Sequence, residues 1–195
     1  MNKAELDNLA NIEGKVRGAT FQTDAKYVLE KKGEEGLKKL EKKMKELGYK
    51  IDYRTAKATD WYPAGLRIIS LLVIKDTFQM SDEDIREMGN TAPKFSFIVK
   101  FVLKIFSLLK KFVREIPIFW KEHFSIGEIE VAEFDEKKKR IVIYLKGVQF
   151  HPIFCLYLEG YCERIIQFVV KNPSCKETKC TFRGDPYHEY SFSWK

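Results

Sequence analysis

The sequence lacks an uninterrupted apolar stretch long enough to cross a membrane. Its most apolar segment, residues 95–112, is interrupted by four lysines, at Lys100, Lys104, Lys110 and Lys111. A membrane-spanning helix needs about 20 mainly apolar residues. Residues 1–14 are polar and acidic, and they do not form the apolar core of a secretory signal. We therefore expect a cytoplasmic protein with no membrane span.

The sequence also lacks the short motifs of several large functional classes. It has no GxGxxG dinucleotide fingerprint, no GxxxxGK[ST] phosphate loop, no helix-turn-helix signature and no CxxC pair. The absent dinucleotide fingerprint weighs against a dehydrogenase-like enzyme. With no recognisable output domain, the chain would act through another protein or simply carry a ligand.

The positive charge is modest and spread out. The 195 residues include 35 Lys and Arg against 28 Asp and Glu, a net charge of +7. Five of the lysines lie on an expected helix at residues 34–47, on a face that also forms Glu–Lys pairs. Such a face is usually solvated. Because no nucleic-acid recognition motif accompanies it, we expect no nucleic-acid partner.

The N-terminal half has the pattern of a helical region. Residues 1–22 are expected to form an N-terminal arm or a first strand, and residues 23–195 a single domain. Apolar spacing predicts helices over residues 23–33, 34–47, 60–78 and 81–89. Gly33 should break the first of these, and Ser81 with Asp84 should cap the last.

A phenylalanine-rich helix is predicted after Pro93. Its apolar face consists of Phe97, Phe101, Ile105, Leu108 and Phe112, and Phe119, Trp120 and Phe124 follow closely. Aromatic side chains at helical spacing usually form core. However, many of the 15 phenylalanines fall in this one segment, which is also how a protein lines an apolar ligand cavity.

The C-terminal half alternates between strands and a helix. Residues 127–134 and 140–148 predict a β-hairpin, residues 151–171 a helix, and residues 174–182 and 187–194 a second hairpin. The fold class is therefore α+β: N-terminal helices, a long Phe-rich helix, and an antiparallel sheet of two hairpins with a helix between them.

The four cysteines all lie in the last quarter of the chain. Cys155, Glu177, Cys180 and His188 would form a closed, structural zinc site if the helix packs on the second hairpin. Glu177 and Cys180 are three residues apart on one strand, so a bulge or bend must bring both inward. Spacing alone leaves His151, Cys162 and Cys175 as alternative ligands.

Three stretches resemble the C-terminal half of the 4-vinyl reductase domain family. They are CLYLEGY at residues 155–161, KETKC at 176–180 and GDPYHEYSF at 184–192. Domains of this family occur in a bacteriochlorophyll-synthesis protein and as sensory domains of phenol- and toluene-responsive transcription activators. They share a fold with TRAPP small subunits and are similar to haem-dependent nitric-oxide-binding domains.

The resemblance implies a zinc-bearing part at residues 125–195. The aromatic-sensing members hold structural zinc through one Cys, one Glu and two further Cys, and these positions fall on Cys155, Glu177, Cys180 and His188 here. Histidine for the last cysteine is conservative for zinc.

The resemblance also bears on the ligand. The sensors hold phenol through a His and a Trp, but Phe106 and Phe134 lie where that pair is expected, which favours a more apolar ligand. Trp120 and His123 are candidate polar groups nearby. The complete predicted ligand-binding set is Phe97, Phe101, Phe106, Trp120, His123 and Phe134.

The leading functional hypothesis is a module that binds or senses a hydrophobic small molecule and is stabilised by zinc. Binding would shift the helix around residues 95–120 and be reported to a signalling partner. A homodimer is expected because the sensory relatives pair. The alternatives are a TRAPP-like interaction adaptor and an enzyme related to tetrapyrrole vinyl reductases.

Overall fold

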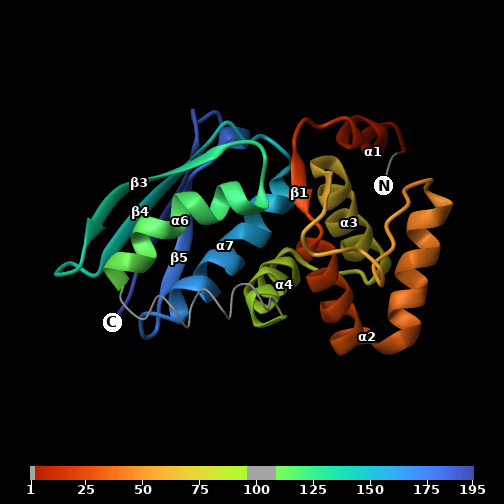
Figure 1. Cartoon of the computed structure of the whole chain (residues 1–195), viewed down its shortest axis with the longest axis horizontal. Coiled ribbons are helices and arrows are strands. Elements are labelled where there is room, and N and C mark those ends of the chain that lie inside the picture. The colour runs from red at the N-terminus through yellow and green to blue at the C-terminus, as the bar shows by residue number, and fades with distance from the viewer. Residues whose placement is uncertain (1–2, 96–108) are drawn as a thin grey trace.

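A computed structural model describes residues 3–95 and 109–195 of the chain. It has two parts that lie side by side (Figure 1). One contains the N-terminal helices α1 to α3, and the other contains a four-stranded antiparallel sheet with α6 and α7. Helix α4 lies between them. The architecture is α+β, as predicted.

The N-terminal part begins with a short helix, α1 (Lys3–Ala10), and a three-residue strand, β1 (Lys15–Arg17). β1 pairs antiparallel with β2 (Trp61–Pro63). The prediction of helix from residue 60 was therefore wrong by four residues, because α3 (Ala64–Thr77) begins only after β2 ends. The backbone of β2 pairs with β1, a distant segment of the chain. The spacing of apolar residues within a short segment cannot predict such a pairing.

Helix α2 (Ala19–Glu46) is bent at Gly33. That residue has φ 68° and ψ −170° inside an otherwise helical run. Such a positive φ suits glycine and strains other residues. The predicted break is confirmed, and the two arms of α2 fold back on each other in Figure 1. The helix starts at Ala19, four residues before the predicted start.

Helix α4 (Asp82–Phe95) has the predicted cap. The Ser81 and Asp84 side chains exchange hydrogen bonds with each other's backbone N–H groups, at 2.8 and 3.1 Å. The predicted end near Gly89 was wrong, since the helix continues to Phe95. Gly89 does not terminate α4 but lets another helix approach.

Helix α7 (Pro152–Gln167) crosses α4 at two glycines. A Cβ atom on Gly89 would lie 2.0 Å from the Tyr157 carbonyl oxygen, and one on Gly160 would lie 1.9 Å from that of Arg86. Arg86 also pairs with two α7 carboxylates, Glu159 at 3.0 Å and Glu163 at 2.6 Å. The two helices are therefore fixed at backbone contact distance.

Substituting Gly160→Ala should destabilise the protein by about 2–3 kcal/mol, because the added methyl group overlaps backbone that cannot rotate away. Without the overlap, the higher helix propensity of alanine would stabilise the protein by about 1 kcal/mol. A lower free energy of unfolding in urea would therefore support the close contact between α4 and α7. Gly89→Ala should behave the same way, and a gain in stability in both variants would contradict the close crossing.

The C-terminal part has the predicted order of two hairpins around a helix. The sheet order is β3-β4-β6-β5. Helices α6 and α7 lie beside it (Figure 1). The bounds are α6 (Leu109–His123), β3 (Glu128–Asp135), β4 (Arg140–Lys146), β5 (Ser174–Lys179), η1 (Thr181–Arg183) and β6 (His188–Ser193).

Two boundaries differ from the prediction by three residues or more in this part. α7 ends at Gln167 and not near residue 171, and the chain turns there before Asn172, which has φ 46°. The predicted strand at 174–182 stops at Lys179, and the 3₁₀ turn η1 begins two residues later, at Thr181. No helix within the described ranges is long and apolar enough to cross a membrane.

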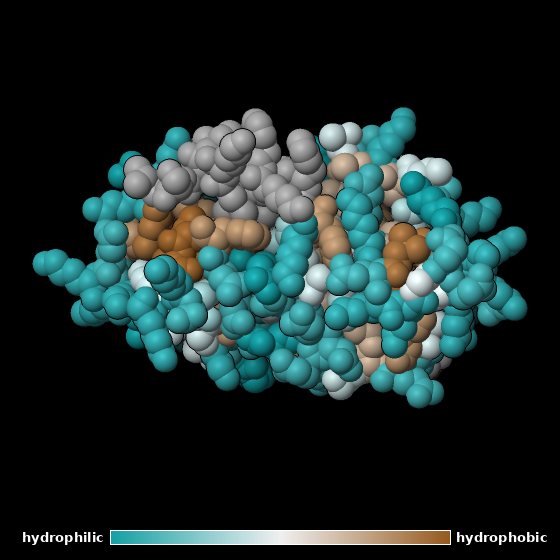
Figure 2. Space-filling model, turned by 90° about the horizontal axis from the view of Figure 1, so that it is seen from below, coloured by the Kyte–Doolittle hydropathy of each residue, from teal (hydrophilic) through white to brown (hydrophobic). Residues whose placement is uncertain are grey.

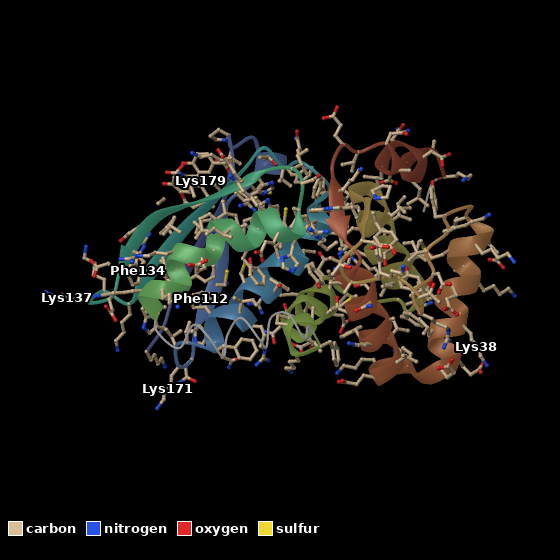
Figure 3. All side chains as sticks on the ribbon, viewed as in Figure 1. Lys38, Phe112, Phe134, Lys137, Lys171 and Lys179 are labelled. Carbon is tan, nitrogen blue, oxygen red and sulfur yellow. The ribbon has the colours of Figure 1, made fainter. Side chains whose placement is uncertain are left out.

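The predicted Phe-rich helix is described only in its C-terminal part, α6. Phe97, Phe101 and Phe106 lie outside the described residues. Phe112 is buried on α6, as its place in the predicted apolar face requires. Figure 3 shows Phe134 toward the hairpin end that carries Lys137.

Candidate metal centre and apolar cavity

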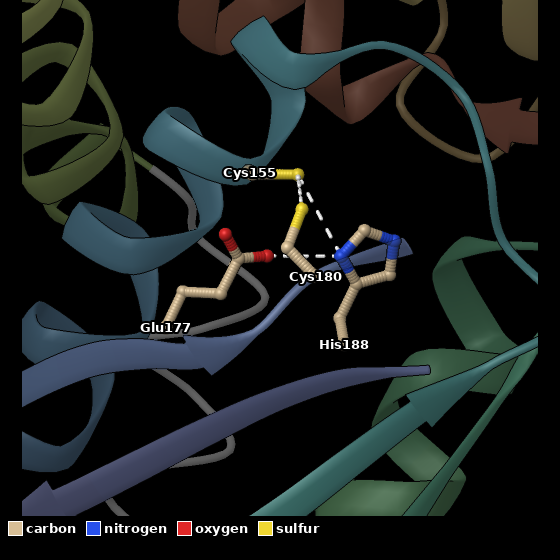
Figure 4. A group of neighbouring side chains, drawn as sticks. All are labelled: Cys155, Glu177, Cys180 and His188. Carbon is tan, nitrogen blue, oxygen red and sulfur yellow. Dashed lines mark hydrogen bonds and ion pairs between the residues drawn. The ribbon is translucent and has the colours of Figure 1, made fainter. Parts of the chain in front are cut away.

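Four side chains from four elements meet beneath the sheet edge (Figure 4). Cys155 comes from α7, Glu177 from β5, Cys180 from the start of η1 and His188 from the start of β6. One potential ligand atom of each lies within 4.8 Å of all the others. This group, called the Cys–Glu–Cys–His cluster below, could hold a metal ion.

A β-bulge brings Glu177 and Cys180 to the same side. The pairing of β5 with β6 shifts register between Glu177 and Lys179. Beyond it, the Cys180 N–H donates to the Asp185 carboxylate at 2.8 Å, and the Arg183 N–H donates to the Cys180 carbonyl at 2.8 Å. The bulge that the spacing of Glu177 and Cys180 required is therefore present.

The spacing of the donor atoms suits tetrahedral coordination. Two sulfurs bound to one zinc ion lie about 3.8 Å apart, and a sulfur and a nitrogen about 3.6 Å apart. The Sγ atoms of Cys155 and Cys180 are 3.8 Å apart, and Cys155 Sγ is 3.7 Å from His188 Nδ1. The Glu177 carboxylate is closer, 2.9 Å from the same nitrogen, and would need to move out slightly.

The tautomer of His188 is set by its other nitrogen. Nε2 lies 3.1 Å from the Val148 carbonyl oxygen, which can only accept, and 3.0 Å from the Thr181 hydroxyl, which can accept or donate, so these partners favour a proton on Nε2. In the neutral ring Nδ1 then has a free lone pair directed at the cluster, as in metal-binding histidines. At 2.9 Å that lone pair and the Glu177 carboxylate repel unless a proton or a cation lies between them.

Without a cation, the electrostatics of the cluster keep the Cys155 thiol protonated. Burial raises the pKa of the Cys155 thiol well above its ordinary value, and Glu177 and Cys180 add to the effect. Burial also acts to raise the pKa of Glu177, but the His188 ring and the thiols outweigh it, so that pKa is lowered. A bound divalent cation reverses this balance for cysteine by stabilising the thiolate.

The structure places the alternative ligands elsewhere. His151 caps α7, where its Nδ1 accepts from the Ile153 N–H at 3.0 Å. Cys175 is fully buried on β5, and Cys162 lines a separate cavity; neither belongs to the cluster.

A cavity of about 140 Å³ lies between α6, α7 and the sheet. Among the described residues its wall is mainly apolar: α6 and α7 contribute aromatic and aliphatic side chains, and β4 contributes Ile141, Ile143 and Leu145. On the face shown in Figure 2, apolar residues reach the surface in the C-terminal part of the molecule, at the left of the view. An engineered cavity of about 150 Å³ with similar walls stays dry and binds benzene.

Two of the predicted ligand-binding residues line this cavity, Trp120 and His123. The Trp120 indole N–H already donates to the Ile126 carbonyl at 3.0 Å, so the ring serves as apolar wall. His123 Nδ1 lies 2.9 Å from the Phe119 carbonyl. Burial lowers the pKa of His123, which keeps the ring neutral. Phe134 is not among the residues that line the cavity.

Arg67 of α3 is one of the cavity residues that sequence reasoning missed. It is 1% exposed and pairs with Asp24, which is 0% exposed, and Ser70 Oγ donates to the same carboxylate oxygen at 2.7 Å. Burial acts to lower the pKa of Arg67, but Asp24, together with Tyr157 and Tyr53, outweighs it, so that pKa is raised. The available signal was one arginine within the apolar run at residues 66–74.

Comparison with solved structures shows the fold. An H-NOX protein from Shewanella oneidensis in the Fe(II)NO ligation state has a TM-score of 0.69 at 13% identity, over 92% of this chain and 99% of that one. A variant Fe(II) unliganded H-NOX protein from K. algicida has a TM-score of 0.65 at 12% identity, over 92% and 96%.

A TRAPP complex subunit also shares part of the fold. Subunit 3 from Naegleria fowleri, covalently bound to palmitic acid, has a TM-score of 0.51 at 15% identity, over 67% of this chain and 93% of that one. No family model and no curated protein matches the sequence. The related folds expected from the resemblance are thus found, while membership of the 4-vinyl reductase family stays a hypothesis.

Haem must be tested against these residues, since another matching structure (TM-score 0.62) is described by its haem and its distorted porphyrin. His123 has the chemistry of an axial ligand. However, even drug-sized ligands occupy pockets of about 300–1,000 Å³, and this cavity has about 140 Å³. Among the described lining residues the cation is Arg67, which Asp24 already neutralises. The described residues do not fit a haem, and the likeness to H-NOX proteins is one of fold.

Proposed function

We propose that this chain is a sensing or carrier domain for a small hydrophobic molecule. The observation that carries the proposal is the apolar cavity between α6, α7 and the sheet. Its volume suits a ligand of about the size of a benzene ring. Trp120 and the β4 side chains would form its walls, and His123 would be a polar group within reach.

The Cys–Glu–Cys–His cluster is proposed as a structural zinc site. Four protein ligands leave no open position for substrate, so the metal would stabilise the fold and take no part in a reaction. It would join α7, which forms one wall of the cavity, to the β5–β6 hairpin. The test of this part is the loss of stability described in the Discussion.

Helix α6 provides a route by which occupancy could be reported. Its C-terminal end is tied to β1: the Ser125 N–H donates to the Lys15 carbonyl at 3.0 Å, and Arg17 Nε donates to the Glu122 carbonyl at 2.9 Å. A ligand that displaces α6 would therefore also displace β1 in the helical part. We propose that a signalling partner binds according to the position of β1 and α6. We also propose that the chain forms a homodimer.

Filling the cavity should abolish binding of a small apolar probe. We expect toluene, titrated into the protein and followed by NMR, to bind at least about tenfold more weakly to Ile143→Trp, because the indole occupies the space. Tyr144→Trp places the same indole on the neighbouring residue, which is not among the residues that line the cavity. It should bind toluene normally. Equal binding by all three proteins would contradict the cavity as the ligand site.

A second candidate is an interaction adaptor, which the likeness to the TRAPP subunit favours. In that case the cavity would hold a permanent acyl chain or remain without an exchangeable ligand. Native mass spectrometry of the purified chain distinguishes the two. A covalent mass increase or a cavity closed to toluene supports the adaptor, and reversible toluene binding supports the sensor.

A further inference from the structure

Arg67 is an unusual residue for the wall of an apolar cavity. Its Nη1 donates to Asp24 Oδ2, but Nη2 is buried and has no hydrogen-bond partner among the described residues, and the same holds for Asp24 Oδ1. A buried donor left unpaired costs about 1–3 kcal/mol, more when it is charged. Proteins usually keep such a group only where something else satisfies it.

The guanidinium group is held rigidly at its place. Its central carbon lies 4.4 Å from the centroid of the Tyr157 ring, and Asp24 holds one edge. Thr23, Arg67 and Tyr157 all line the cavity. Because the group is already fixed, a ligand atom that met it would lose little free energy in ordering the protein.

The charge balance decides what kind of atom can meet Arg67. Asp24 neutralises the guanidinium, so an ionised carboxylate from a ligand would add an uncompensated negative charge to an apolar site. Glu115 also lines the cavity and would disfavour an anion further. A neutral carbonyl oxygen satisfies Nη2 and leaves the charge balance unchanged.

We infer that Arg67 is the polar recognition group of the cavity, and that it selects compact apolar molecules bearing one neutral oxygen acceptor, such as a ketone, ester or amide. This inference rests on the proposed function. It names the ligand class, and it excludes fatty-acid anions and other ionised carboxylates from the site.

The test uses three probes with equal numbers of non-hydrogen atoms: acetophenone, α-methylstyrene, in which a methylene replaces the oxygen, and benzoate. Each is titrated by NMR into the full chain and into Arg67→Lys, which keeps the charge but loses Nη2. Acetophenone should bind about tenfold more weakly to Arg67→Lys, since one charge-assisted hydrogen bond is lost. α-Methylstyrene should change less than about twofold. Benzoate should bind the unaltered chain more weakly than acetophenone does.

Arg164→Lys is the matched control. Arg164 is a half-buried arginine that bonds Asn90 at 3.0 Å and does not line the cavity. Its substitution should leave the affinities of all three probes unchanged. If Arg67→Lys fails to fold, the guanidinium NMR signal of Arg67 in the unaltered chain replaces it, and acetophenone should shift that signal more than α-methylstyrene does.

Each outcome separates the inference from the function on which it rests. Equal effects of Arg67→Lys on acetophenone and α-methylstyrene would overturn the inference, as would tightest binding of benzoate, and both results would leave the apolar cavity as a ligand site. Binding of none of the three probes would overturn the proposed function and the inference together.

Discussion

Replacing Cys180 by serine should lower the free energy of unfolding by about 4 kcal/mol or more, because a structural zinc site contributes its binding energy directly to folding. For a domain of this size that corresponds to a fall of about 10 °C in the unfolding temperature. Cys180 is buried, and its Sγ lies 3.8 Å from that of Cys155. Differential scanning calorimetry with elemental analysis of the same samples measures both stability and metal.

Chelation provides the second half of this test. A strong chelator should destabilise the unaltered protein by an amount similar to the Cys180→Ser change, and it should have little further effect on the variant. Cys162→Ser is the matched control, since Cys162 lies on the same helix as Cys155 but outside the cluster. It should keep its metal and most of its stability. Less than about half an equivalent of zinc per chain would contradict the proposal.

The Cys–Glu–Cys–His cluster was accessible to sequence reasoning because three of its four residues are close together in the sequence. Glu177, Cys180 and His188 belong to one hairpin, so a turn and one bulge suffice to gather them. Cys155 arrives only because α7 packs against β5. The types of donor atom and the resemblance were enough to predict these four residues as ligands. Whether a bulge brings Glu177 and Cys180 to the same side could be seen only in the structure.

The errors in the fold share a physical cause. β1 and β2 are three residues each, too short to show an alternating pattern, and they exist through pairing with a distant segment. Gly89 has the appearance of a helix end in the sequence, yet it serves the crossing with α7. At β1–β2 and at Gly89 a contact with a distant segment determines the structure. The sequence around each position does not indicate that contact.

Arg67 shows the same limit within the functional site. An arginine in a helix is normally expected at the surface, and its burial here depends on Asp24, 43 positions earlier in the chain. The sequence around Asp24 or around Arg67 does not indicate that the two residues form an ion pair. The cavity walls could be anticipated from the aromatic residues, but the charged group beside them could not.

Arg67→Met should destabilise the protein by about 3–5 kcal/mol at pH 7, because it leaves Asp24 buried without its counter-charge. The double variant Asp24→Asn with Arg67→Met should recover much of this loss, since no buried charge remains. Chemical unfolding of the unaltered protein, Arg67→Met, Asp24→Asn and the double variant gives the coupling free energy of the pair. Lys38→Met is a surface control: Lys38 pairs with Glu35 at 2.7 Å, is well exposed in Figure 3, and should change stability by less than about 1 kcal/mol.

The pH dependence of Arg67→Met identifies the charge responsible. Burial raises the pKa of Asp24 in the folded protein, and without Arg67 less opposes that rise. A carboxyl group whose pKa is higher when folded destabilises the protein fully above that folded pKa, and the penalty disappears below its unfolded pKa of about 3.9. The gap in stability between Arg67→Met and the unaltered protein should therefore narrow as the pH falls from 7 to 4. A gap that stays constant, or a double variant no more stable than Arg67→Met, would show that α2 and α3 are not joined by a buried ion pair.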